Sequence, residues 1–163
     1  MLLGQAQVTH SAGAAAEAEL WKRAAAVAQL SNAVRRMRRE ARLLGGSAPQ
    51  LHVAANNMDV GTVRALIVAG NDVNEAASNG LTPLHYASLS GCSDCVRALI
   101  SAGATCNAQD AHGMTPLHYA IIENNSECIS LLISNGADVD AGDNVGNRPL
   151  HYAYFLQGSA FNP

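Results

Sequence analysis

The sequence is short of charged and of aromatic side chains. Of its 163 residues, 14% are charged and 4% are Phe, Trp or Tyr, whereas about a quarter are charged in an average soluble domain. A core with so few aromatic rings has to be built from Ala, Leu, Val and Ile, whose small volumes suit short helices that approach each other closely. Hydrophobic residues nevertheless make up 48% of the chain, which is too apolar for a disordered protein. We therefore expect one folded domain with an appendage.

Long apolar runs and an export signal are also missing. No run approaches the roughly 18 residues that a membrane-spanning helix needs. The first residues, MLLGQAQ, lack the charged flank and apolar centre of a secretory signal. We expect a reducing compartment, cytoplasmic and/or nuclear.

Positive charge is scarce over most of the chain. Residues 1–48 carry one Lys and six Arg against three Glu, a net charge of +4, and residues 49–163 carry three Arg against ten acids, a net charge of −7. Phosphate groups are bound by clustered Lys and Arg. We therefore expect no nucleic-acid binding by the acidic part.

A six-residue motif recurs every 33 residues in that acidic part. It reads TPLHYA at 82–87, TPLHYA at 115–120 and RPLHYA at 148–153. A weakened copy, LHVAA, begins at Leu51, and a second block repeats in the same register as VRALI at 63–67, VRALI at 96–100 and ISLLI at 129–133. Chance does not produce such a register, so the chain contains structural repeats.

The local signals of each unit predict two short helices. Thr82 and Thr115 precede Pro, and Thr-Pro is a favourable helix start. Gly91 and Asn124 tolerate the left-handed backbone that ends a helix. A second helix follows, with apolar residues at helical spacing, and it closes at Gly103.

These residues resemble the ankyrin repeat, whose 33-residue period and T-P-L-H-x-A signature they share. The resemblance covers residues 49–156 and implies an all-α, ankyrin-repeat solenoid of helix-turn-helix plus β-hairpin finger units. Each unit would supply part of its neighbour's core. The copies would span 49–81, 82–114, 115–147 and, in part, 148–156.

Both ends depart from the repeat pattern. Copy one has Pro49-Gln50 in place of Thr-Pro and Met58 in place of Gly, as expected of a terminal repeat. In copy four, Pro163 would break a second helix. We expect the underside of this copy to be exposed, covered by the tail (residues 157–163), or covered by sequence that is absent here.

Residues 14–46 are expected to form a basic amphipathic helix after a flexible N-terminus, residues 1–13. Apolar residues recur every seven positions in it, and five Arg crowd the opposite face. We expect this helix to cap copy one. Self-association is an alternative, but three or four heptads are few for a coiled coil, so a monomer is expected rather than a homodimer. For the basic face of residues 20–44 three alternatives stay open: a nuclear-import signal, a calmodulin-type target, or contact with an anionic membrane.

The histidines and cysteines were considered as metal ligands. Equivalent histidines lie one repeat apart, so they should not converge on an ion, and the resemblance implies that each bonds the backbone of the adjoining turn; they are His52, His85, His118 and His151. Cys92 and Cys95 have a spacing seen in zinc and redox sites. However, Cys95, Cys106 and Cys128 fall at core positions of the repeat. We expect no metal, no cofactor and only Cys92 exposed.

No catalytic arrangement is visible, and the resemblance implies a non-catalytic protein–protein interaction module, an adaptor or scaffold. It would bind a partner on the concave surface made by the finger tips and first helices. The apolar character of several of these positions indicates an apolar peptide or helix as the partner. Mapped by register, the binding residues are Leu81, Leu89, His112, Met114, Ile122, Glu123, Val145, Asn147, Phe155 and Leu156.

The resemblance also implies a modification site, and a second function stays open. The asparagine of the Asp-Val-Asn turn is a site of asparaginyl hydroxylation in some members, and Asn74 and Asn107 match that position. The alternative function is a regulatory or targeting fragment or subunit of a larger enzyme or complex, localised by its Arg-rich helix.

Overall fold

The computed structural model describes residues 16–25, 28–29 and 49–158. Residues 16–25 and 28–29 are helical. From residue 49 to residue 158 the chain forms three pairs of short helices followed by a seventh helix. They are α2 (Gln50–Asn56), α3 (Val60–Val68), α4 (Pro83–Ser90), α5 (Ser93–Ser101), α6 (Pro116–Ile122), α7 (Ser126–Ser134) and α8 (Pro149–Gly158).

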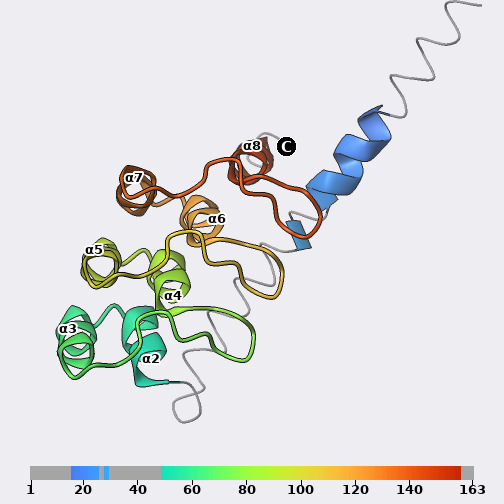
Figure 1. Ribbon diagram of the computed structural model, residues 1–163. Helices are drawn as coiled ribbons and strands as arrows, with labels where there is room; N and C mark the ends of the chain where they lie inside the picture. Colours follow the sequence, from blue (N-terminus) through green and yellow to red (C-terminus); the bar gives the residue numbers. More distant parts are fainter. Residues whose placement is uncertain (1–15, 26–27, 30–48, 159–163) are drawn as a thin grey trace, which may run out of the picture.

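The helices stack in two layers (Figure 1). In one layer α2 packs on α4, α4 on α6 and α6 on α8; in the other, α3 packs on α5 and α5 on α7. Loops project from the stack on the side of the first layer. The predicted all-α repeat solenoid is therefore confirmed.

Each first helix begins and ends as the sequence predicts. Thr82 lies at the start of α4 with Pro83 in the first turn, and the backbone N–H of Thr82 donates to Nδ1 of His85 at 3.0 Å. Gly91 ends α4 with a φ of 75°, and Asn124 takes the same left-handed conformation after α6, with a φ of 53°. The repeat boundaries are thus set by local chemistry.

The core runs through the whole stack and is made of small aliphatic side chains. Ala54, Ala87 and Ala120 occupy one position of the first helix in successive repeats and are at most 5% exposed. Because Ala has a single methyl group, neighbouring first helices approach closely at this position. Leucines fill the space between the two layers, and they include Leu84, Leu99, Leu117 and Leu132.

The loops between repeats do not contain the expected β-strands. The described residues include no strand, so the β-hairpin detail is not confirmed. Instead two hydrogen bonds between backbone groups close each loop. The amide of Ala77 donates to the carbonyl of Leu81 at 2.9 Å, and that of Gly80 donates to the carbonyl of Ala77 at 2.8 Å. We call these connections finger loops; they are residues 71–81, 104–114 and 137–147.

The predicted basic helix falls largely outside the described residues. In the part that is described, Leu20 and Trp21 are 49% and 74% exposed. The remaining predictions for this helix involve residues beyond 29, which lie outside the described residues. They are the capping of copy one, self-association and the three alternatives for the basic face, and they stay predictions. Within the described ranges, no helix is long and apolar enough to cross a membrane.

Candidate functional site

The three finger loops are joined to one another by hydrogen bonds. The amide of Ala111 donates to the carbonyl of Asn79 at 3.1 Å, and the amide of Asn144 donates to the carbonyl of His112 at 2.9 Å. The side chain of Asn144 adds a third bond, from Nδ2 to the carbonyl of Ala111 at 3.0 Å. The tips therefore form one continuous row instead of three independent loops.

Asparagine side chains strengthen the bases of the same loops. Asn74 accepts from the amide of Thr105 at 2.8 Å and donates to the carbonyl of Gly103 at 3.1 Å. Asn107 makes the same pair of bonds one repeat later, with Asp138 and Gly136. Both amides thus stabilise contacts between repeats. Their hydroxylation stays a prediction.

The row of tips offers small, polar and apolar side chains to solvent. Val145 is 60% exposed, and Ser78, Ala111, His112 and Asn144 are also exposed. No Lys or Arg occurs in the three finger loops. This surface can form van der Waals and hydrogen-bond contacts, and it has no Lys or Arg with which to hold a phosphate.

Buried histidines connect each repeat to the next. Nε2 of His85 bonds the carbonyl of Met114 at 3.1 Å, and Nε2 of His118 bonds that of Asn147 at 3.3 Å. Because Nδ1 of His85 already accepts from a backbone amide, the proton lies on Nε2, which donates to the carbonyl. Burial lowers the pKa of His85 to about 4, although the bond to Met114 acts in the opposite sense. The predicted structural role is therefore confirmed for His85 and His118, whereas for His151 the described residues show only the bond from the amide of Arg148 to Nδ1.

The first histidine differs because of the residue at the helix start. Nε2 of His52 bonds the carbonyl of Glu75 at 2.9 Å, as its equivalents do in later repeats. Nδ1 of His52, however, is buried and has no hydrogen-bond partner among the residues that the structure describes. Pro49 occupies the place of Thr82, and proline has no amide hydrogen to donate.

Buried hydrogen bonds between a tyrosine and an aspartate also recur one repeat apart. Tyr119 donates to Asp110, and Tyr152 donates to Asp143 at 2.6 Å. Burial alone would raise the pKa of Asp143, but bonds from Tyr152 and Asn147 outweigh it and lower that pKa. These carboxylates therefore serve as acceptors for the last two finger loops.

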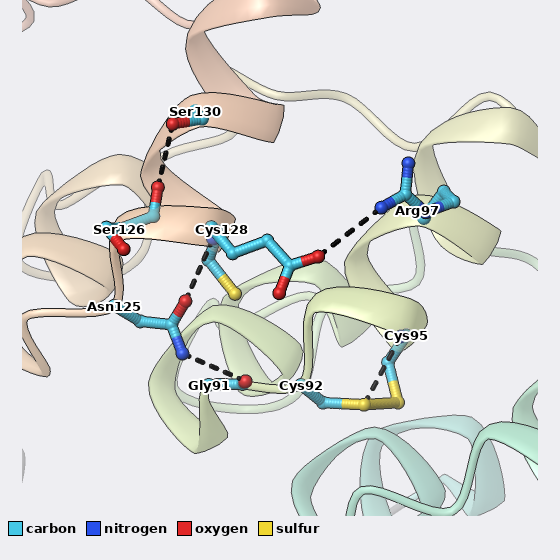
Figure 2. A network of polar contacts seen from close by, with 9 residues as sticks. Gly91, Cys92, Cys95, Arg97, Asn125, Ser126, Cys128 and Ser130 are labelled. Atoms are coloured by element: carbon cyan, nitrogen blue, oxygen red, sulfur yellow. Dashed lines mark hydrogen bonds and ion pairs between the residues drawn. A yellow bond between two sulfur atoms is a disulfide. The ribbon is translucent and has the colours of Figure 1, made fainter.

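Figure 2 shows a disulfide between Cys92 and Cys95, with a Cα–Cα separation of 5.2 Å. The prediction that Cys92 is exposed is wrong, because Cys92 turns inward at the start of α5 and is 7% exposed. Nearby, Nδ2 of Asn125 donates to the carbonyl of Gly91 at 3.1 Å, which ties the next repeat to this turn. The pair thus lies inside a contact between repeats.

The other two thiols lie at or near the core. Cys128 is buried and Cys106 is half-buried. Burial raises the pKa of the Cys128 thiol to about 11 and also raises that of Cys106. Neither is a reactive thiolate at neutral pH. In the parts of the chain that the structure describes, His, Cys, Asp and Glu form no cluster that could hold a metal ion.

The predicted binding residues divide into two groups. Four of them are buried at 0–1% exposure and cannot touch a partner, so their expected exposure is wrong: Leu81, Leu89, Met114 and Asn147. Register places these residues on the concave side, but their side chains pack into the core or, for Asn147, against Asp143. The others are at least partly accessible: His112, Ile122, Glu123, Val145, Phe155 and Leu156. For these six, partner binding stays a prediction.

The fourth copy is incomplete, as its sequence indicates, and three apolar residues around it are exposed that the sequence pattern does not single out. Leu150, Ile133 and Val139 are 75%, 46% and 49% exposed. Leu150 occupies the position of Leu117, which is 1% exposed. Among the described residues no second helix follows α8, and in earlier copies such a helix covers this position.

Comparison with known proteins gave one family match. A family model described as ankyrin repeats, in three copies, matches residues 25–110, 51–143 and 102–159. No curated protein matches the chain.

Proposed function

Because this chain belongs to the ankyrin-repeat family, whose members are protein–protein interaction modules, we propose that it is a non-catalytic adaptor or scaffold. Its binding surface is the row of finger tips, with the half-buried Ile122 at the end of α6 and the accessible side chains of α8 beside it. His112 and Val145 are the exposed members at the tips, and Phe155 is the half-buried member on α8.

The proposal is supported by the hydrogen bonds that join the finger loops. A flexible loop loses conformational entropy when it binds, whereas loops that already hold each other lose little. The bonds from Ala111 to Asn79 and from Asn144 to His112 fix the tips before a partner arrives. The row can therefore recognise a partner by shape.

The partner expected on this row is an apolar peptide or helix. Val145 offers the largest exposed apolar side chain at the tips, and His112 lies on the neighbouring tip. An apolar contact surrounded by polar side chains is the usual composition of a small binding patch.

Paired variants of two exposed valines test the proposal. Val145→Asp places a charge on the tips, and Val68→Asp places one on α3, where Val68 is 87% exposed. Both variants and the unaltered chain would be tagged and used to capture proteins, and each captured protein would then be purified and titrated directly. We expect Val145→Asp to weaken binding of the purified partner roughly tenfold or more, with unchanged helicity and melting temperature. Equal binding by Val145→Asp, or equal loss in Val68→Asp, would reject the tips as the binding surface.

A further inference from the structure

A groove lies between α3 and α5, in the layer of second helices (Figure 1). It has a volume of about 380 Å³, and both of its charged residues are arginines. The lining consists of Arg64, Ile67 and Val68 on α3 and of Arg97, Ala98 and Ser101 on α5. None of these residues belongs to the finger loops, so the groove is separate from the surface proposed above.

The two arginines occupy the same position of successive second helices and differ in their ion pairs. Arg97 lies 3.5 Å from Glu127 on α7 (Figure 2). By register, the partner of Arg64 would be Asp94 on α5, whose side chain is one methylene shorter than that of Glu127. Within the described residues Arg64 has no ion-pair partner. The groove therefore presents an exposed cation that can accept a carboxylate from outside.

The apolar part of the groove also has a counterpart in the next repeat. Ala98 lines the space between α3 and α5, whereas Leu131 stands at the same position of α7 and is half-buried. A leucine fills more of the space beside the preceding helix than a single methyl group does. Thus α7 supplies a leucine and a glutamate where α5 supplies an alanine and a shorter carboxylate. What α5 lacks indicates the chemistry of an occupant.

The charge of the groove favours the same kind of ligand. Arg64 and Arg97 are the only Lys or Arg residues in 49–147, and α3 contains no acidic residue. The pair of Arg97 and Glu127 is exposed and contributes little, so a ligand carboxylate can replace Glu127 at small cost. Nucleic acids and other polyanions are repelled by the net charge of −7 on residues 49–163. A ligand with few carboxylates and an aliphatic side chain is attracted.

We propose that the α3–α5 groove binds a short segment of a partner protein in which leucines are flanked by glutamates. The aliphatic side chains lie on Ala98 and its apolar neighbours, and the carboxylates pair with Arg64 and Arg97. The ligand thus supplies the two groups that Glu127 and Leu131 supply in the next repeat. This interaction does not involve the finger tips, so the inference goes beyond the proposed function.

Synthetic peptides probe the groove. We would titrate the full chain into a fluorescein-labelled peptide of about eight residues with glutamates on both sides of a central pair of leucines. In extended form it is longer than α3 or α5, each of which has 9 residues. One matched peptide carries Gln in place of each Glu, and another carries Ala in place of each Leu. We expect saturable binding of the first peptide, weakened by added salt, and at least roughly threefold weaker binding of each matched peptide.

Variants that copy residues of α7 into α5 locate the binding. Asp94→Glu lengthens the carboxylate that register places beside Arg64, and Ala98→Leu fills the apolar space. The double variant should bind the peptide roughly tenfold more weakly, with helicity and melting temperature measured alongside. Arg64→Gln changes an exposed side chain, so the fold should be retained, and binding should weaken roughly threefold or more. Arg148→Gln removes the same charge outside the groove, and it is the matched control that should bind normally.

The exposed valines distinguish this site from the finger tips. Val68 lines the groove, so the new carboxylate in Val68→Asp should weaken binding of the acidic peptide, whereas Val145→Asp should leave it unchanged. For a partner of the tips the expected effects are reversed. Failure of one proposal is therefore distinguishable from failure of the other.

Several results would overturn the proposal. One is a lack of saturable binding, or equal binding of either matched peptide. Another is an affinity that Arg64→Gln leaves unchanged, or that Arg148→Gln lowers equally, because the attraction would then depend on net charge alone. Inorganic phosphate that displaces the peptide at equal concentration would make the groove a simple anion site. A dimer in sedimentation experiments that Arg64→Gln dissociates would make a second copy the occupant.

Discussion

Met58 and Gly91 occupy the same position in successive repeats, and both have a left-handed backbone, with φ of 59° and 75°. This conformation turns the chain from the first helix of a repeat into the second. Glycine adopts it freely, whereas a side chain such as that of Met makes it cost about 1–2 kcal/mol. Copy one therefore contains backbone strain that copy two lacks.

Replacing Met58 by Gly should relieve that strain. The Met58 side chain is 47% exposed, so little burial is lost, and we expect Met58→Gly to raise the free energy of unfolding by about 1 kcal/mol. Urea denaturation followed by circular dichroism measures it. The matched variant Gly91→Ala should lower the free energy, because a Cβ there would lie 2.8 Å from Nδ2 of Asn125. A loss of stability in Met58→Gly would contradict the explanation.

The sequence was sufficient for the repeat architecture because its signals are local. Thr-Pro starts, Gly91 and Asn124 each specify a backbone conformation without reference to distant residues. Burial depends on what packs over a position. Met114, assigned by register to the concave surface, lies in the core, and Leu150, equivalent to the buried Leu117, is exposed. Neither outcome is encoded in the residue type.

The cysteines also show that side-chain packing and direction cannot be deduced from residue type and spacing. Cys95 and Cys128 were correctly placed in the core from their register. The disulfide between Cys92 and Cys95 was missed, because it depends on the side-chain direction of Cys92 at the start of α5. Spacing alone is compatible with a free thiol, a metal ligand or a disulfide.

The buried histidines should make the fold less stable in mild acid. His85 has a pKa of about 4 in the folded chain, lowered from 6.5 mainly by burial, and burial also lowers the pKa values of His52 and His118. Below pH 6.5 the unfolded chain binds protons that the folded chain does not. The contribution of these histidines to the free energy of unfolding is therefore fully present above pH 6.5 and is lost progressively between pH 6.5 and 4. For His85 alone, the loss from pH 7 to pH 5 is about 2 kcal/mol.

Urea titrations at a series of pH values test this dependence. Between pH 6.5 and 4, the free energy of unfolding should fall less steeply with pH in His85→Gln than in the unaltered chain, although the variant is less stable at every pH. His112→Gln, which replaces an exposed imidazole, is the control for loss of a histidine outside the core. An unchanged slope in His85→Gln would show that this histidine is not the group responsible.

The tyrosine–aspartate pairs should contribute more in the later repeats than in the first. Tyr152 donates to the buried carboxylate of Asp143 at 2.6 Å, so Tyr152→Phe leaves that carboxylate short of a donor, at a cost of about 1–3 kcal/mol. Ala77 stands in the place of the aspartate beside Tyr86. Within the described part of the chain, the hydroxyl of Tyr86 has a single polar contact, with Asn79 at 3.5 Å. Tyr86→Phe should therefore cost less. Equal losses in the two variants, measured by thermal unfolding, would argue against the pairs.

The disulfide can be tested by counting thiols. In denaturant without reductant, two thiols should react with a chromogenic disulfide reagent, and after reduction all four cysteines should react. Four reactive thiols before reduction would show that Cys92 and Cys95 are not bonded. Because the bond closes a ring of only a few residues, its loss should cost no more than about 2 kcal/mol.

Substitutions at Cys92 separate the effect of the disulfide from that of the helix cap which the same residue provides. Cys92 also caps α5, where its sulfur accepts from the amide of Cys95 at 3.2 Å. Cys92→Ser keeps a capping acceptor and should unfold like the reduced chain. Cys92→Ala loses both, and it should be less stable than Cys92→Ser by about 1 kcal/mol. If the two variants are equally stable, the cap contributes nothing measurable, and the whole effect of Cys92 lies in its bond to Cys95.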